Sequence, residues 1–135
     1  MKNILCLSLI ILLSACAGQF KGMEAPNKDE AVIYYYRPWK YVGAALSIDV
    51  KENGKFIADL DVNEYKVHKT NAGLKVISTD TISDDVSLPF TAEKGKSYFI
   101  KVENDYCFSL LGCTEINLIP EAKALNEIQK CNKVE

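Results

Sequence analysis

The feature that most constrains the fold of this chain is a succession of short segments rich in β-branched and aromatic residues, which starts at Glu30. Turn residues, such as Asn53-Gly54 and Glu93-Lys94-Gly95, separate these segments from one another. The segments are AVIYYYRP, AALSIDV, KFIADL, EYKVHKT, LKVIST, DVSLPFTAE, SYFIKVE and TEINLI. This pattern predicts an all-β domain, an antiparallel β-sandwich or open barrel of about seven to eight strands.

One hairpin in this series allows a prediction of strand register. Apolar residues alternate with polar ones on both strands, at positions 46, 48 and 50 and again at positions 56, 58 and 60. A three-residue loop, Glu52-Asn53-Gly54, would pair Val50 with Phe56, whereas a two-residue loop would turn Phe56 to the solvent. We therefore expect the three-residue loop, with Gly54 in the left-handed conformation of a G1 bulge.

The segment that follows the last predicted strand has the features of a helix. Pro120 suits the first helical position, and Glu121 suits the first turn. Ala122, Leu125 and Ile128 recur on one face. We expect one C-terminal α-helix that packs this face against the sheet.

The N-terminus has the features of a secretory signal peptide, predicted over residues 1–15. The apolar stretch at residues 4–13 is far shorter than the about 20 residues that a membrane-spanning helix needs. Leu13-Ser14-Ala15-Cys16 resembles the lipobox of bacterial lipoproteins, in which the cysteine thiol receives a diacylglyceryl group. Ala15-Cys16-Ala17 also fits ordinary signal peptidase, which would cut after Ala17 and leave a soluble protein. We favour the lipobox, and with it the lipidation of Cys16.

Lipidation would hold the protein on a membrane of the bacterial cell envelope. The diacylglyceryl group carries two acyl chains. Together they make a lasting anchor, because each CH₂ group buried in the membrane contributes about 0.8 kcal/mol of binding free energy. Ala17 stands where an aspartate would resemble an inner-membrane retention signal, so the resemblance implies the outer membrane, facing the periplasm. Residues 16–29 are small and polar, and we expect a flexible tether to one domain at residues 30–135. The formal charge of −2 is spread along the chain, which argues against a nucleic-acid partner.

Several short motifs, taken in order, resemble one protein family. A strand ends in Tyr36-Arg37-Pro38, a hairpin carries Asn53-Gly54, and a later strand contains Gly95-Lys96-Ser97-Tyr98-Phe99. With the lipobox in front, this order is similar to that of the bacterial lipoprotein family called domain of unknown function 2846, over residues 30–118. The family has no established activity, so the resemblance implies fold and location only.

Motifs that support catalysis are absent from the sequence. There is no Gly-x-Ser-x-Gly elbow and no glycine-rich phosphate loop, so we expect no enzyme activity, no metal and no cofactor. His68 is the only histidine, and its alternation with Tyr65 and Lys66 indicates the solvent face of a strand. The acidic pairs Asp84-Asp85 and Glu103 with Asp105 are more typical of solvated turns than of a calcium site.

Cys107, Cys113 and Cys131 would remain in the mature chain besides the lipidated cysteine. An exported protein lies where disulfides persist, so we expect one bridge and one free thiol. A bridge from Cys131 to the loop at residues 107–113 is favoured, because it would fasten the C-terminus. Pairing of Cys107 with Cys113 is the alternative. It requires a loop, because the ends of a strand of that length would lie about 20 Å apart.

The segment RPWKY, residues 37–41, is the candidate binding surface. Pro38 ends the strand, so Trp39 and Tyr41 fall in a loop beside the cations Arg37 and Lys40. Exposed aromatic residues with cations suit a protein or glycan partner. The competing interpretation, which we favour, packs Trp39 against the end of the core.

Two functions agree with these features. The first, which we favour, is a lipid-anchored binding or scaffolding protein on the periplasmic face of the envelope, with another envelope protein as its partner. The second is a small inhibitor of an envelope hydrolase such as a lysozyme, which would insert a loop into the cleft of the enzyme. This second function rests on a likeness in size to lipoprotein lysozyme inhibitors.

Overall fold

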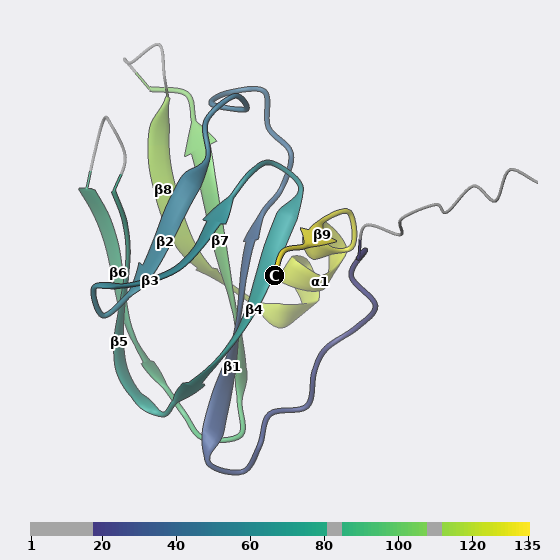
Figure 1. Cartoon of the computed structure of the whole chain (residues 1–135), viewed down its shortest axis with the longest axis vertical. Helices are drawn as coiled ribbons and strands as arrows, with labels where there is room; N and C mark the ends of the chain where they lie inside the picture. The colour runs from purple at the N-terminus through teal and green to yellow at the C-terminus, as the bar shows by residue number, and fades with distance from the viewer. Residues whose placement is uncertain (1–17, 81–84, 108–111) are drawn as a thin grey trace, which may run out of the picture.

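The computed structural model describes residues 18–80, 85–107 and 112–135 of the chain. These residues form two β-sheets and one short helix (Figure 1). The predicted all-β fold with one C-terminal helix is confirmed, as a sandwich of two sheets that do not close into a barrel in the described part of the chain. The elements are β1 (Glu30–Arg37), β2 (Ile48–Glu52), β3 (Lys55–Leu60), β4 (Glu64–Asn71), β5 (Gly73–Asp80), β6 (Asp85–Ala92), β7 (Ser97–Asp105), β8 (Cys113–Ile119), α1 (Glu121–Ile128) and β9 (Asn132–Lys133).

The strand order places the first strand at the centre of the larger sheet. The five-stranded sheet has the order β8-β7-β1-β4-β9, and the four-stranded sheet has the order β3-β2-β5-β6. Most pairs are antiparallel, but β1 and β7 run parallel, with Val32 opposite Ser97 and Tyr36 opposite Lys101. The predicted antiparallel arrangement holds for most pairs. The parallel pairs, β1 with β7 and β4 with β9, were not foreseen, because the apolar pattern of a strand does not record the direction of its neighbour.

β1 is covered on both faces, which explains its nearly continuous apolar sequence. Ile33 and Tyr35 face the four-stranded sheet and belong to the core between the two sheets. Tyr34 and Tyr36 face the other way and belong to a second core, on the outer side of the larger sheet. A strand with two buried faces has no polar side to alternate with, so its sequence loses the period of two.

α1 covers part of this second core. Ala124 and Ile128 are buried against the sheet, whereas Ala122 is exposed. The predicted helix is therefore confirmed, but its buried face is rotated relative to the predicted one. No helix in the part of the chain that the structure describes has the length and hydropathy to cross a membrane.

The segment at residues 18–24 covers the rest of the second core. Figure 1 shows it starting beside α1 and β9, before the chain runs on to the start of β1. The ring of Phe20 packs edge to face on Tyr34 and Tyr65, with centroid distances of 6.1 and 5.5 Å. Glu24 donates its backbone N–H to the Tyr34 hydroxyl and pairs with Lys133 at 3.0 Å. The structure thus differs from the predicted tether at residues 16–29, because an aromatic residue in this segment fills a place in the core.

The β2–β3 hairpin has a two-residue turn rather than the predicted three-residue loop. Asn53-Gly54 has φ values of 49° and 79°, as a type I′ turn requires. A bulge at Ile57 shifts the register, so that Val50 pairs with Ala58. The bulge thereby brings the buried apolar residues of β2 opposite those of β3. Phe56, however, is left exposed. The predicted pairing of Val50 with Phe56 is therefore wrong.

Candidate binding site at the end of the sandwich

Arg37 ends β1, and it is buried rather than part of a surface. Its guanidinium donates hydrogen bonds to the carbonyl oxygens of Leu46, Gly43 and Leu60, the last two at 2.8 Å. Burial lowers the pKa of Arg37 from its usual value, and these carbonyl groups replace the water that the cation has lost. Arg37 therefore holds the loop at residues 38–47 against the sheet, and its assignment to the binding surface is wrong.

The aromatic residues of this loop point into the solvent. Trp39 is 59 % exposed and Tyr41 is 80 % exposed. The expectation that Trp39 caps the core is wrong, because Arg37 already fixes the loop through backbone carbonyl groups. The side chains of Trp39 and Tyr41 are therefore free to face outward on a loop with a fixed backbone.

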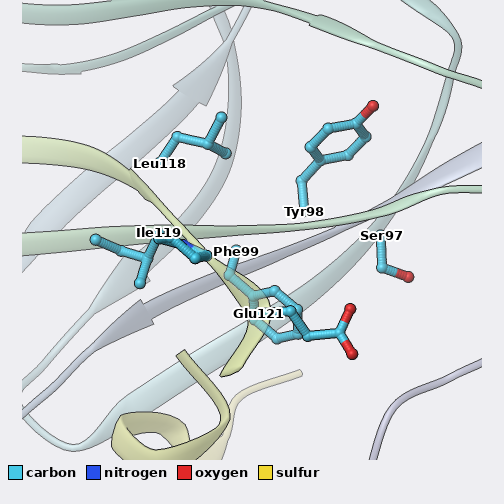
Figure 2. A pocket seen from close by; sticks show the side chains of 7 residues that line it. Ser97, Tyr98, Phe99, Leu118, Ile119 and Glu121 are labelled. Carbon is cyan, nitrogen blue, oxygen red and sulfur yellow. The ribbon is translucent and has the colours of Figure 1, made fainter. Parts of the chain in front are cut away.

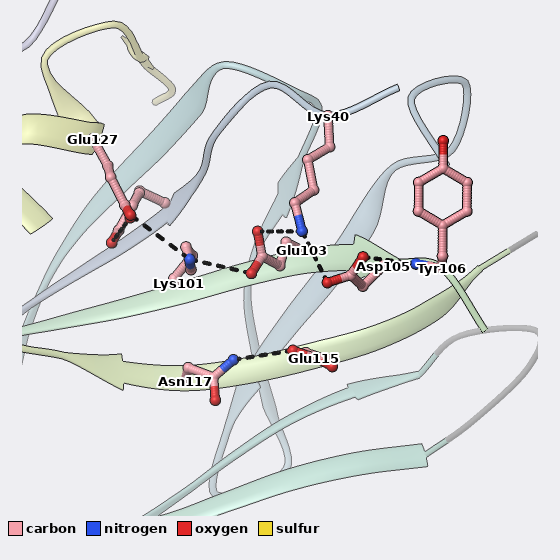
Figure 3. A network of polar contacts seen from close by, with 9 residues as sticks. Lys40, Lys101, Glu103, Asp105, Tyr106, Glu115, Asn117 and Glu127 are labelled. Atoms are coloured by element: carbon pink, nitrogen blue, oxygen red, sulfur yellow. Dashed lines mark hydrogen bonds and ion pairs between the residues drawn. The ribbon is translucent and has the colours of Figure 1, made fainter. Parts of the chain in front are cut away.

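Lys40 joins this loop to β7, as Figure 3 shows. Its Nζ lies 3.2 Å from Oε2 of Glu103 and 3.1 Å from Oδ2 of Asp105. Burial lowers the pKa of Lys40, but its hydrogen bonds to the two carboxylates outweigh burial and leave the pKa above its usual value. The backbone N–H of Tyr106, together with Lys40, holds the pKa of Asp105 below its usual value. This acidic pair is thus bound by lysines, since Lys101 Nζ also lies 3.1 Å from Oε1 of Glu103.

Only one of the two acidic pairs lies wholly within the described residues. Glu103 and Asp105 bind Lys40, while Asp84 of the other pair lies outside the described part of the chain. Residues 18–80, 85–107 and 112–135 contain no group of three or more His, Cys, Asp or Glu side chains that could hold a metal ion.

A third exposed aromatic residue follows the end of β7. Tyr106 is 81 % exposed, and its backbone N–H donates to the same Asp105 carboxylate that binds Lys40. Sequence reasoning missed Tyr106, although it shares with Tyr41 the position of an aromatic residue just beyond a strand. We call Trp39, Tyr41 and Tyr106 the aromatic end.

The loop at residues 38–47 approaches β7 closely at Gly43. This glycine has a φ of 67°, and a Cβ atom there would collide with the side chain of Asn104. A glycine is therefore required both by the backbone conformation and by the space. The close approach keeps the loop beside the end of β7, next to Tyr106.

The disulfide bond joins Cys107 to Cys113, with the Cα atoms 5.7 Å apart. The favoured pairing with Cys131 is wrong, and the alternative pairing is confirmed. The reason is the β7–β8 pairing, in which Asp105 lies opposite Cys113. Cys107 follows Asp105 by only two residues, so it is close to Cys113. Cys131 is a free, buried thiol in the second core and donates to the carbonyl oxygen of Arg37 at 3.8 Å.

A group of polar side chains, some buried and some half-buried, lies between the two sheets around Glu52. Its carboxylate accepts hydrogen bonds from the hydroxyl groups of Tyr35 at 3.2 Å and Thr70 at 2.6 Å. Lys75 Nζ lies 3.1 Å from this carboxylate, and His68 Nε2 lies 3.5 Å from it. We call these five residues the Glu52 cluster. The prediction that His68 faces the solvent is wrong, because β4 turns His68 toward the four-stranded sheet.

The ionisation of the Glu52 cluster follows from burial and from the neighbouring charges. Burial raises the pKa of Glu52, but hydrogen bonds from Thr70 and Lys75 outweigh burial and leave the pKa below its usual value. Burial lowers the pKa of His68, and the charge of Lys75 lowers it further, against the opposite effect of Glu52. Glu52 is thus the charged partner of Lys75, while His68 is neutral at pH 7.

A hollow of about 300 Å³ lies between β7, β8 and the start of α1 (Figure 2). Phe99, Leu118 and Ile119 give it an apolar lining, to which Tyr98 also belongs. The Tyr98 hydroxyl accepts a hydrogen bond from the backbone N–H of Glu93. This hollow offers apolar contact, and no sequence motif predicted it.

The comparison with known families concerns the same strands and loops. Cys16 and the predicted signal peptide lie outside the described residues. No curated protein matches the chain. The family model described as protein of unknown function (DUF2846) matches residues 27–109, from just before β1 to beyond β7 and including the aromatic end. Because this match covers more than half of the chain, the protein belongs to the DUF2846 family of proteins of unknown function.

Proposed function

We propose that this protein is a lipid-anchored, non-enzymatic binding protein of the bacterial cell envelope, and that the aromatic end is its binding surface. The observation that carries the proposal is the exposure of Trp39 and Tyr41 on a loop whose backbone is fixed by Arg37. A domain gains no stability from holding a tryptophan in water, whereas aromatic side chains on ordered backbone are typical of binding surfaces.

The anchor is proposed from the sequence. Leu13-Ser14-Ala15-Cys16 resembles a lipobox, and Ala17 after the cysteine supports the outer membrane, with the domain facing the periplasm. A non-enzymatic role is supported by the absence of catalytic motifs from the sequence and by the engagement of His68 with Glu52. The partner in the envelope would meet the aromatic end.

Metabolic labelling with a fatty-acid analogue tests the anchor. The wild-type chain should carry the label, whereas Cys16→Ser should stay unlabelled, because the acceptor thiol is gone. Cys131→Ser is the matched control and should stay labelled. A wild-type mature chain that starts at Gly18 and stays in the aqueous phase would show that the lipobox interpretation is wrong.

Retention on isolated cell envelopes tests the binding surface. The Cys16→Ser variant, which lacks the acceptor thiol, should bind envelopes through the aromatic end. The further change Trp39→Ala should weaken this binding about thirtyfold, the equivalent of about 2 kcal/mol, without a change in melting temperature. Leu74→Ala is the control, because Leu74 is 67 % exposed on the four-stranded sheet, away from the aromatic end.

Two results would contradict this proposal. Equal retention of Trp39→Ala and the parent chain would remove the aromatic end as the binding surface. If a hydrolase is recovered from the envelope in a one-to-one complex with the protein, and its activity is lost on binding, the protein is an inhibitor rather than a scaffolding protein.

A further inference from the structure

We infer that a hollow beside Trp39 binds the ring of a pyranose sugar. This inference rests on the proposed function, because it names the ligand of the same end of the molecule. The hollow has a volume of about 340 Å³, at the lower end of the range of small-molecule sites. We call it the Trp39 hollow. Its lining comes from the loop after β1, from the β3–β4 turn and from α1 with the residues that follow it, namely Pro38, Trp39, Asn63, Asn126, Glu127 and Lys130.

The walls of the Trp39 hollow are held in place by the fold. Asn63 donates its backbone N–H to the carbonyl oxygen of Arg37 at 2.8 Å and accepts from the N–H of Asn132 at 2.7 Å. Glu127, labelled in Figure 3, accepts a hydrogen bond from the Tyr36 hydroxyl at 2.6 Å. A ligand would therefore meet walls that are already positioned, which lowers the entropy lost on binding.

Polar groups in the Trp39 hollow are available to a ligand. The side chains of Asn63, Asn126 and Lys130 make no hydrogen bond or ion pair with another residue that the structure describes. The two amides offer both donors and acceptors, the ammonium offers donors, and the carboxylate of Glu127 offers acceptors. This set suits a neutral ligand with several hydroxyl or amide groups.

The combination of the indole ring with these polar groups selects the class of ligand. A pyranose ring has an apolar C–H face, which can lie on the indole ring of Trp39, and hydroxyl groups along its edge, which can reach the amides. A lipid chain would require a lining without amides and charges. A nucleotide could also stack on the indole ring, but its phosphates would require more cations than Lys130, and the lining also contains the carboxylate of Glu127.

Tryptophan fluorescence tests this inference directly, because Trp39 is the only tryptophan in the chain. The full chain in detergent is titrated with the trimer of N-acetylglucosamine and, separately, with a trimer of glucose. We expect a saturable change of emission with at least one of them, and the two arms separate an acetylated sugar from a plain hexose.

Matched variants locate the binding. Asn126→Ala and Lys130→Ala remove exposed side chains of the hollow, and each should weaken the affinity about fivefold or more at an unchanged melting temperature. Leu74→Ala removes an exposed side chain outside the lining of the hollow and outside the aromatic end, and should leave the affinity unchanged. The absence of a saturable change with either trimer overturns the inference. A change that neither Asn126→Ala nor Lys130→Ala affects also overturns it.

Envelope retention separates this inference from the proposed function. If Trp39→Ala loses retention while Asn126→Ala keeps it and the trimers do not compete, the aromatic end binds a protein, and only the sugar assignment fails. If Trp39→Ala keeps full retention, the proposed binding surface fails, and the fluorescence titration still decides whether the hollow takes a sugar.

Discussion

Lys75 shows how a single buried charge can reverse the pattern of a strand. β5 turns Lys75 into the sandwich, while its neighbours Leu74 and Val76 face the solvent. The reason is Glu52 on β2, which is buried and requires a cationic partner. Lys75 and Glu52 lie on separate strands, so no local pattern in the sequence could predict that they form an ion pair.

The titration of His68 makes the stability of the fold depend on pH. Its folded pKa lies below the ordinary value of about 6.5. As the pH falls through about 6.5, the unfolded chain therefore takes up a proton before the folded protein does, and the free energy of unfolding should decrease. The contribution of His68 to the slope of the free energy of unfolding against pH should not exceed about 1.4 kcal/mol per pH unit, because only one proton is taken up. Urea unfolding between about pH 5 and 7.5 measures it.

His68→Gln is the variant that isolates this titration. It should flatten the stability profile near pH 6.5 and leave the decrease at lower pH, where the unfolded chain protonates the carboxyl group of Glu52 first. An identical profile in wild type and variant would assign the dependence to another group.

Cys131 should be an unreactive thiol in the folded protein. Burial raises its pKa to about 12, so the thiolate that reacts with alkylating reagents is scarce at pH 8. We expect alkylation of Cys131 only in denaturant, as read from a peptide mass map. Cys107 and Cys113 should be labelled after reduction alone, and rapid labelling of Cys131 without denaturant would contradict its buried position.

At the scale of elements, the alternation of residue types predicted the strands well but not their partners. The predicted strand at residues 74–79 is found as β5 with one more residue at each end. The predicted strand at residues 44–50 is found only from Ile48, because Arg37 holds the residues before it in a loop. For the candidate site, the pattern gave Trp39 and Tyr41 correctly as loop residues but misplaced Arg37, since burial of a cation depends on distant carbonyl groups.

The Asn53-Gly54 turn gives a direct test of the hairpin. Gly54→Ala should lower the free energy of unfolding by about 1–2 kcal/mol, because the Cβ atom of alanine makes the left-handed backbone conformation at this position unfavourable. No atom lies within 4 Å of the added Cβ, so a steric clash does not contribute. Gly54→Asn should lower the free energy less, because asparagine tolerates this conformation. Chemical denaturation of the three proteins measures both changes, and equal losses would argue against the type I′ turn.

At the scale of the whole molecule, the larger sheet is packed on both of its faces. Segments that precede the first strand and follow β8 contribute to this packing. The four-stranded sheet covers one face, while α1 and residues 18–24 cover the other. The sequence predicted the helix but not the role of residues 18–24, because one Phe20 among polar residues gives no periodic signal. The domain is therefore larger at its N-terminal end than the pattern of strands indicates.

Phe20→Ala tests whether this segment belongs to the folded unit. Phe20 is half-buried on Tyr34 and Tyr65, so its removal should lower the free energy of unfolding by about 2 kcal/mol, less than the about 3–5 kcal/mol of a fully buried phenylalanine. Met23→Ala, at an exposed position of the same segment, serves as the control. Equal stability of Phe20→Ala and wild type in urea would return residues 18–24 to the role of a tether.

The parallel pairing of β1 with β7 also sets the order in which the chain can fold. β1 is synthesised first, yet its partner on one side, residues 97–101, is synthesised only after five further strands. Closing so long a loop is slow, and until it closes the tyrosines and isoleucine of β1 lack part of their cover. An intermediate with an open edge on this strand is prone to aggregate. A chain that stops before β7 therefore has no means of completing the sheet around its central strand.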